Sequence, residues 1–219
     1  MIPLAGDGEA WSFAPAFGKP ITAPPAVCDR RIYFGCEDGY LYVLGHEGKS
    51  KLPTKPLDLH RIRSPLTGPL AASRYDWNTN YGNSSHRNWN DQGVKPPLKL
   101  KWIRRYEGMF KHLPVCGGGR MYTHTAEGQI FAVEQETGRL LWRKYWPGVH
   151  LSFTAPVYYR SGNGEYLLIP QAGMRQSRMR CLDAATGELL WEAPFTTQHS
   201  LGTRRANARN ADCPVSRMV

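Results

Sequence analysis

One pattern of eleven residues occurs twice with identical spacing, and it limits the fold of this chain more than any other feature. The first copy reads Ala132-x-Glu134-x-x-Thr137-Gly138-x-x-x-Trp142, and the second reads Cys181-x-Asp183-x-x-Thr186-Gly187-x-x-x-Trp191. The two tryptophans are 49 positions apart, from 142 to 191. A repeat of this length indicates an architecture of stacked units, each of which needs its neighbours to bury its apolar face.

The residues around each copy predict four short antiparallel strands. Glycines at 117–119, at 128 and at 138 separate short runs that are rich in apolar and aromatic residues. Glycine supplies the positive φ that tight hairpin turns need. Four strands in about forty residues is the size of a propeller blade. We therefore predict an all-β fold, a β-propeller built from four-stranded antiparallel blades.

The repeated turn assigns a role to each of its residues. The acid and the threonine can hydrogen-bond the turn backbone, and the glycine accepts a left-handed conformation. The tryptophan is predicted to project from the outer strand and to pack on the neighbouring blade. The predicted structural residues are Thr137, Gly138, Trp142, Asp183, Thr186, Gly187 and Trp191.

This turn resembles the tryptophan-docking repeat of the pyrroloquinoline-quinone-like propeller superfamily, with the consensus Ala-x-Asp-x-x-Thr-Gly-x-x-x-Trp. The superfamily includes quinoprotein alcohol dehydrogenases and the outer-membrane assembly lipoprotein propellers. The resemblance covers residues 21–48 and 98–195. The first unit departs from the consensus, because its turn, Gly45–Gly48, is shortened and no tryptophan follows. Superfamily propellers have about seven or eight blades, so a chain with about three predicts an incomplete propeller.

The sequence predicts the following division of the chain. Residues 1–48 form the end of a propeller or a degenerate blade, 49–75 a linker, 76–200 blades with tryptophan-docking motifs, and 201–219 a disordered or unrelated tail. The run from Asp76-Trp77 is similar to the opening of many propellers of this kind, which indicates the start of a second propeller with residues 1–48 as the tail of a previous one. The alternative is one propeller in which the residues after 48 form a long decorated loop.

Charge and hydropathy exclude several classes of partner. The formal net charge is +10, but the basic residues are scattered, which predicts a solvated surface and no nucleic-acid partner. No run approaches the roughly 18 apolar residues of a transmembrane segment. Residues 1–13 lack the pattern of a signal peptide. The resemblance implies a periplasmic or envelope location, which the residues themselves do not determine.

Motifs for catalysis are missing from the sequence. Resemblance to a quinoprotein dehydrogenase would imply pyrroloquinoline quinone stacked between a tryptophan and a disulfide of adjacent cysteines, Ca²⁺ held by Glu and Asn, and an Asp base. None of the five cysteines is adjacent to another. No Gly-x-Ser-x-Gly, phosphate-binding loop or His-Glu-x-x-His occurs. We therefore predict no catalytic, cofactor or metal residues, with the quinone and calcium expected only if the chain is part of such an enzyme.

Four residues near the start of the second unit are the candidates for facing a ligand. Residues that precede the first strand of a blade, or that lie on its first hairpin, line the faces of a propeller. These positions are occupied by His112, Arg120, Tyr122 and His124.

The preferred functional hypothesis is a non-catalytic, quinoprotein-like propeller segment that acts as a protein-binding scaffold. Its expected partner is another protein or the missing propeller blades. One alternative is a fragment of a quinone-dependent dehydrogenase, which adjacent cysteines in the parent protein would favour. The other is the sensor propeller of a larger signalling protein such as a kinase, which a kinase domain or a membrane segment would reveal.

Overall fold

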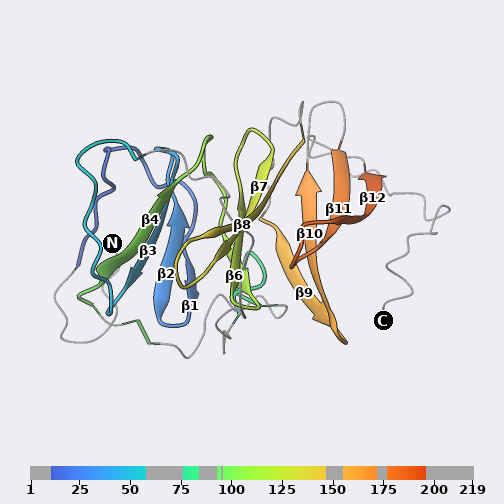
Figure 1. Cartoon of the computed structure of the whole chain (residues 1–219), viewed down its shortest axis with the longest axis horizontal. Coiled ribbons are helices and arrows are strands. Elements are labelled where there is room, and N and C mark those ends of the chain that lie inside the picture. Colours follow the sequence, from blue (N-terminus) through green and yellow to red (C-terminus); the bar gives the residue numbers. More distant parts are fainter. Residues whose placement is uncertain are drawn as a thin grey trace, which may run out of the picture.

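A computed structural model describes residues 11–57, 76–83, 93–94, 96–146, 155–171 and 177–195 of the chain. These residues form twelve strands, arranged as three four-stranded antiparallel sheets that lie side by side (Figure 1). Within the described ranges there is no helix, and hence none of the length and hydropathy needed to cross a bilayer. The three sheets confirm the predicted all-β fold of antiparallel blades that make up part of a propeller.

Each blade runs through its four strands in sequence order. Blade 1 contains β1 (Ala26–Cys28), β2 (Arg31–Gly35), β3 (Tyr40–Gly45) and β4 (Lys99–Arg105). Blade 2 contains β5 (Val115–Gly117), β6 (Arg120–His124), β7 (Gln129–Glu134) and β8 (Leu140–Tyr145). Blade 3 contains β9 (Val157–Ser161), β10 (Gly164–Gln171), β11 (Ser177–Asp183) and β12 (Leu189–Phe195).

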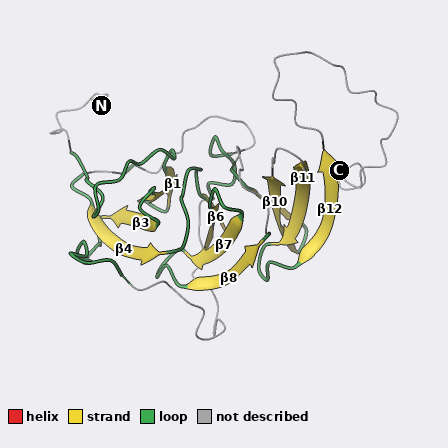
Figure 2. Ribbon diagram, turned by 90° about the horizontal axis from the view of Figure 1, so that it is seen from above, coloured by secondary structure: helices red, strands yellow, loops and turns green. Residues whose placement is uncertain are grey.

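The first strands of neighbouring blades contact one another, β1 with β5 and β5 with β9. The fourth strands β4, β8 and β12 follow one curved rim of the molecule (Figure 2). This is the arrangement of a propeller, in which first strands lie at the centre and fourth strands at the circumference.

Blade 1 is completed by a strand that follows a long insertion. Strand β3 pairs with β4, although residues 46–98 separate them in the sequence. Residues before 48 and residues after 98 therefore share one sheet. Most of the predicted linker, from 58 to 75, and the predicted tail 201–219 lie outside the described residues.

The three blades have the same register at the same places. One row of paired residues crosses each blade and ends at a tryptophan on the fourth strand, and we call it the tryptophan row. The rows are Ala26–Tyr33–Val43–Trp102, Val115–Tyr122–Ala132–Trp142 and Val157–Leu168–Cys181–Trp191. In every blade the register shifts immediately after the third residue of the row. Such a bulge changes the direction of the neighbouring side chains, so the tryptophan points in the same direction relative to its sheet in each blade.

Two apolar clusters stabilise the stack of blades. The larger one joins all three blades and includes Trp102, Phe131, Trp142 and Leu182. The smaller one lies on the opposite side of blade 1, around Phe34 and Tyr42 on β2 and β3. Three aromatic residues ahead of β1 pack against it, namely Trp11, Phe13 and Phe17. The chain itself thus covers the side of blade 1 that faces away from blade 2.

Candidate functional site

The joint between blades 1 and 2 is built around Trp102. Its indole Nε1 donates a hydrogen bond of 2.9 Å to the carbonyl oxygen of Gln135, in the turn between β7 and β8. A Cβ atom on Gly138 would lie 2.6 Å from the Trp102 ring, so the ring rests directly on the glycine backbone. Trp102 is only 3% exposed. Blade 1 thus does have a tryptophan at the docking position, although it follows the insertion and not the turn at Gly45.

The joint between blades 2 and 3 repeats this geometry with Trp142. Its Nε1 donates to the carbonyl oxygen of Ala184 at 3.0 Å, and a Cβ on Gly187 would lie 2.6 Å from the ring. Gln135 and Ala184 each follow the acid of the repeated turn, so the two acceptors are equivalent. A shared contact at two successive joints identifies these tryptophans as interblade contacts.

The other residues of the repeated turn fix the backbone that carries this carbonyl acceptor. In blade 3, Thr186 donates both its N–H and its hydroxyl to Asp183 Oδ1, at 2.8 and 3.0 Å. The N–H of Gly187 bonds the carbonyl of Asp183 at 2.8 Å with φ near +72°. In blade 2, the hydroxyl of Thr137 bonds Glu134 and Gly138 has φ near +69°. The turn therefore has a fixed shape on which a flat ring can rest.

The third tryptophan row has no blade beside it among the described residues. Val157, Leu168 and Trp191 are only partly buried, whereas the equivalent residues of the other two rows are buried. Within the described ranges, nothing accepts a hydrogen bond from the Trp191 indole. Tyr159 lies two residues after Val157, on the same face, and is 43% exposed. We call this surface, formed by Val157, Tyr159, Tyr166, Leu168 and Trp191, the open face of blade 3.

Two of the four residues predicted to face a ligand lie together. The rings of His112 and His124 are 4.6 Å apart between centroids. Burial, together with the nearby His124 and Lys111, lowers the pKa of His112 to about 4. At neutral pH the imidazole of His112 is therefore uncharged. His112 is partly buried, and His124 is buried.

His112 is expected to make the chain less stable in mild acid. Because its pKa in the folded state lies below the ordinary value of about 6.5, the unfolded chain binds a proton more readily. Stability should be fully present above pH 6.5 and should fall as the pH drops from about 6.5 towards 4. Thermal melting across this range should show a smaller loss for His112→Gln than for the wild type. The exposed His46 offers a matched control, since His46→Gln should leave the dependence unchanged. An unchanged profile for His112→Gln would contradict this expectation.

The other two candidates, Arg120 and Tyr122, lie in the joint between blades 2 and 3. Tyr122 is fully buried, stacks on the ring of Tyr158 at 5.7 Å, and donates a hydrogen bond of 3.2 Å to the carbonyl of Ala184. Arg120 Nη1 pairs with Glu165 Oε2 at 2.6 Å. The structure therefore separates them from the histidine pair and places them between the blades.

Three side chains donate hydrogen bonds to the Glu165 carboxylate at this joint. Besides Arg120, it accepts from Arg160 Nη2 at 2.8 Å and from the Tyr158 hydroxyl at 2.9 Å. Partial burial would raise the pKa of Glu165, but the hydrogen bonds from Tyr158 and Arg160 and the charge of Arg120 outweigh it and lower the pKa. The carboxylate is thus held ionised as a structural link from β6 to β9 and β10.

A second charged group joins blades 1 and 2. Arg31 Nε lies 2.6 Å from Glu47 and its Nη1 lies 2.9 Å from Glu136, while Lys101 pairs with both carboxylates. Burial alone would raise the pKa of Glu47, but backbone hydrogen bonding and the bonds from Arg31 and Lys101 lower it to about 2. Glu136 belongs to the repeated turn of blade 2, so this network adds a charged contact beside the Trp102 contact.

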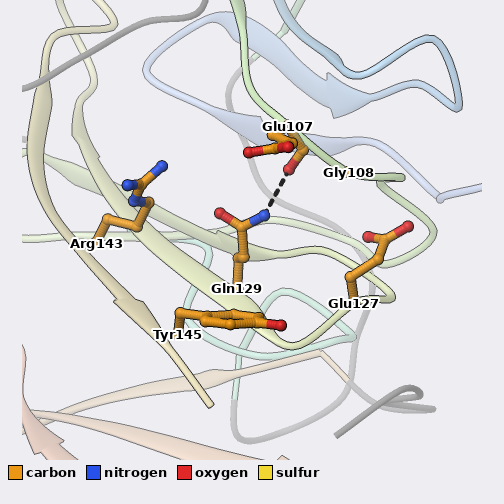
Figure 3. Close-up of a pocket in the computed structure, with 6 residues that line it drawn as sticks. All are labelled: Glu107, Gly108, Glu127, Gln129, Arg143 and Tyr145. Carbon is orange, nitrogen blue, oxygen red and sulfur yellow. Dashed lines mark hydrogen bonds between the residues drawn. The ribbon is translucent and has the colours of Figure 1, made fainter. Parts of the chain in front are cut away.

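A polar pocket of about 380 Å³ lies where the connection from blade 1 reaches blade 2 (Figure 3). Gln129 donates from Nε2 to the carbonyl of Glu107 at 2.9 Å, and Glu127 accepts from the N–H of Met109 at 2.9 Å. Arg143 and the exposed ring of Tyr145 complete the lining. The pocket offers both charge signs and an aromatic face to a polar ligand, but no nucleophile next to a base.

The sequence did not predict how the segment around Trp77 pairs with the blades. Its backbone pairs with Cys116 on β5, with N–H···O distances of 3.0 and 2.7 Å, and the carbonyl of Asn78 accepts from Tyr158 N–H at 2.9 Å. The Trp77 ring is buried in the larger cluster. Part of the insertion thus lies along the first strands of blades 2 and 3 and forms backbone hydrogen bonds with them. This pairing joins distant segments, and the repeat pattern of the sequence does not predict it.

The described residues do not form the quinone site that the resemblance would imply. No two cysteines are adjacent, and no group of three His, Cys, Asp or Glu side chains within the described ranges could hold a metal ion. The Trp77 ring is packed against Gly82 and the core, so it presents no free aromatic face. We therefore derive no chemical step through a quinone or calcium from these residues.

The chain is similar to dehydrogenases over part of their length. The polyvinylalcohol dehydrogenase of Sphingopyxis sp. (strain 113P3) is 25% identical over 160 residues, which is 67% of this chain and 23% of that protein. A europium-containing methanol dehydrogenase matches 84% of this chain and 26% of its own, with 16% identity and a TM-score of 0.54. At that identity the likeness shows the fold alone. The chain spans about a quarter of the length of either protein.

The chain is also similar to proteins of outer-membrane assembly. The structure of BamB from Moraxella catarrhalis matches 81% of this chain and 38% of its own, with 14% identity and a TM-score of 0.46. A family model described as the outer membrane protein assembly factor BamB matches residues 98–215, more than half of the 219 residues. The predicted resemblance is confirmed, and the chain belongs to this family of pyrroloquinoline-quinone-like propeller repeats.

Proposed function

We propose that this chain is a non-catalytic, quinoprotein-like propeller segment that acts as a protein-binding scaffold through the open face of blade 3. The observation that carries the proposal is the register of the third tryptophan row. In blades 1 and 2, the equivalent row is buried by the turn of the next blade, with Trp102 and Trp142 donating to a turn carbonyl. Trp191 has the same position in its blade, but Trp191, Val157 and Leu168 of its row are only partly buried.

The contacts of Trp142 indicate what kind of partner the open face binds. The partner should present a rigid turn with an exposed carbonyl for the Trp191 indole and a glycine beneath the ring, as the Asp183–Gly187 turn does for Trp142. The occupant is therefore a further four-stranded blade, from the rest of a longer chain or from a partner protein. We propose that residues 26–195 make up one propeller segment, with residues 46–98 as its insertion.

The other end of the stack is unsuited to the same role. The side of blade 1 that faces away from blade 2 is covered by Trp11, Phe13 and Phe17 of this chain. By contrast, Leu189 at the start of β12 is 46% exposed, whereas its equivalent Leu140 in blade 2 is 3% exposed. Binding is therefore expected at one end of the stack only.

Photocross-linking in the source organism tests this proposal. The photoreactive residue p-benzoylphenylalanine would replace Tyr159 on the open face or, as a matched control, Tyr145 in the polar pocket, which is also exposed. We expect light-dependent cross-links from position 159 to a segment with an Asp-x-x-Thr-Gly turn, either in a partner protein or elsewhere in the same polypeptide, and their loss when Trp191→Ala is added. Cross-links from position 145 alone would assign binding to the pocket, and no cross-links from 159 would contradict the proposal.

A second candidate is a piece of a quinone-dependent dehydrogenase, which the similarity to the polyvinylalcohol dehydrogenase favours. Titration of the purified chain with pyrroloquinoline quinone and Ca²⁺, followed by absorbance and thermal melting, separates the two candidates. For the scaffold we expect no saturable change in absorbance or Tm. A saturable shift with dye-linked oxidation of an alcohol would replace the scaffold proposal with the enzyme.

A further inference from the structure

Two cysteines on neighbouring blades point towards each other. Cys28 lies two residues after Ala26 on β1, so it shares the face of the tryptophan row, which looks towards blade 2. Cys116 follows Val115, whose side chain faces blade 3, so Cys116 looks back towards blade 1. Strands β1 and β5 are in contact, and both cysteines belong to the larger apolar cluster. Both side chains are fully buried, and neither cysteine is in a disulfide.

The surroundings hold both cysteines in place. Gln135 donates from Nε2 to the sulfur of Cys28 at 3.4 Å, and the carbonyl of the same Gln135 accepts from Trp102. Cys116 is fixed by its two backbone hydrogen bonds to Trp77. The thiols thus meet at a point where the interblade contact and the insertion both restrict movement of the backbone.

The other cysteines in the described ranges are placed differently. Cys36 belongs to the cluster on the far side of blade 1, and its sulfur contacts the carbonyls of Lys19 and Pro20. Cys181 lies in the tryptophan row of blade 3. Because Cys36 and Cys181 lie away from the contact between β1 and β5, they serve as controls.

We propose that Cys28 and Cys116 form a disulfide that joins the first strands of blades 1 and 2. The step is thiol–disulfide exchange with a small oxidised disulfide such as oxidised glutathione. One cysteine thiolate attacks that disulfide and releases one glutathione thiolate, and the second cysteine thiolate then displaces the other. The two cysteines lose two electrons and two protons, which the glutathione disulfide takes up to become two thiols.

Burial determines when this exchange can occur. Desolvation, with the hydrogen bond to Cys28 next in importance, raises the pKa of the Cys116 thiol well above its ordinary value. Because the thiolate is the nucleophile, the closed joint reacts slowly, and the disulfide forms while the joint is open. Once formed, it closes a loop from 28 to 116 that includes the whole insertion, which restricts the unfolded chain. We expect a rise in Tm of about 10 °C.

The test uses the full purified chain incubated with oxidised glutathione in sub-denaturing urea, so that the joint opens transiently. The reaction is quenched with N-ethylmaleimide, and the disulfides are mapped by peptide mass after proteolysis without reduction. We expect one linked pair of peptides, containing Cys28 and Cys116, and a higher Tm that dithiothreitol reverses. Cys36→Ser and Cys181→Ser should retain both results, and Cys28→Ser and Cys116→Ser should lose both.

Two results would overturn the proposal. One is recovery of Cys28 and Cys116 as separate glutathione or maleimide adducts, with no linked peptide. The other is a set of linked peptides spread over all cysteine pairs, which would mean that the fold does not bring these two together. The pairing is independent of whether the open face of blade 3 binds a protein.

Discussion

Replacing Trp142 by alanine is expected to lower the free energy of unfolding by about 3–5 kcal/mol. The indole is 6% exposed, donates to the Ala184 carbonyl at 3.0 Å and lies over the backbone of Gly187. Its removal leaves a cavity between blades 2 and 3. The rigid Asp183–Gly187 turn of blade 3 cannot move to fill this cavity. Urea unfolding followed by circular dichroism measures the loss, as a shift in midpoint with little change in slope.

Trp191→Ala is the matched control, because it makes the same chemical change at the equivalent position of blade 3. Trp191 is only partly buried and has no described blade beside it, so the expected loss is about 1 kcal/mol, set by the smaller apolar area that it buries. Equal losses for the two variants would contradict the assignment of Trp142 to a closed joint and Trp191 to an open face.

Gly187→Ala is expected to destabilise the chain by about 3 kcal/mol through two effects. The backbone at Gly187 has φ near +72°, where an alanine costs about 1 kcal/mol. In addition, the new Cβ would lie 2.6 Å from Cδ2 and 2.8 Å from Cε3 of Trp142, so the ring must leave its position on the turn. Thermal or urea unfolding of the variant provides the measurement.

Gly162→Ala separates these two effects. Gly162 also has positive φ, near +54°, but no atom lies within 4 Å of the position that its Cβ would take. This variant should lose only the backbone contribution of about 1 kcal/mol. If both variants lost the same amount, the tryptophan ring would not rest on Gly187. Gly138→Ala should behave like Gly187→Ala, because its Cβ would meet Trp102 at 2.6 Å.

Features that depend on neighbouring residues could be read from the sequence. The Asp183–Thr186–Gly187 turn involves residues within five positions of one another, and its hydrogen bonds follow from the chemistry of those side chains. In blades 2 and 3, successive strands are separated by only a few residues of sequence, so their order follows from alternating apolar runs and glycines. Repetition of the pattern then predicted a fold in which equivalent units stack.

The placement of candidate site residues could not be read in the same way. Arg120, Tyr122 and His124 alternate on one strand, which indicates a shared face but does not reveal what covers it. Blade 3 covers that face at Tyr122 through the Tyr158 ring and the Ala184 carbonyl, whereas His124 meets His112 from the preceding loop. Similarly, no local pattern connects Cys28 with Cys116 or Arg31 with Glu136.

The sequence by itself determined the kind of unit, a four-stranded antiparallel blade with a tryptophan at its outer strand, because turn chemistry and strand alternation act over a few residues. Only the tertiary structure decided how the units are completed and joined. Blade 1 obtains its fourth strand and Trp102 from beyond an insertion, and Trp11, Phe13 and Phe17 cover its outer side. Strands β3 and β4 pair because segments far apart in the sequence bury their apolar side chains together. A contact between such distant segments produces no periodic pattern in the sequence.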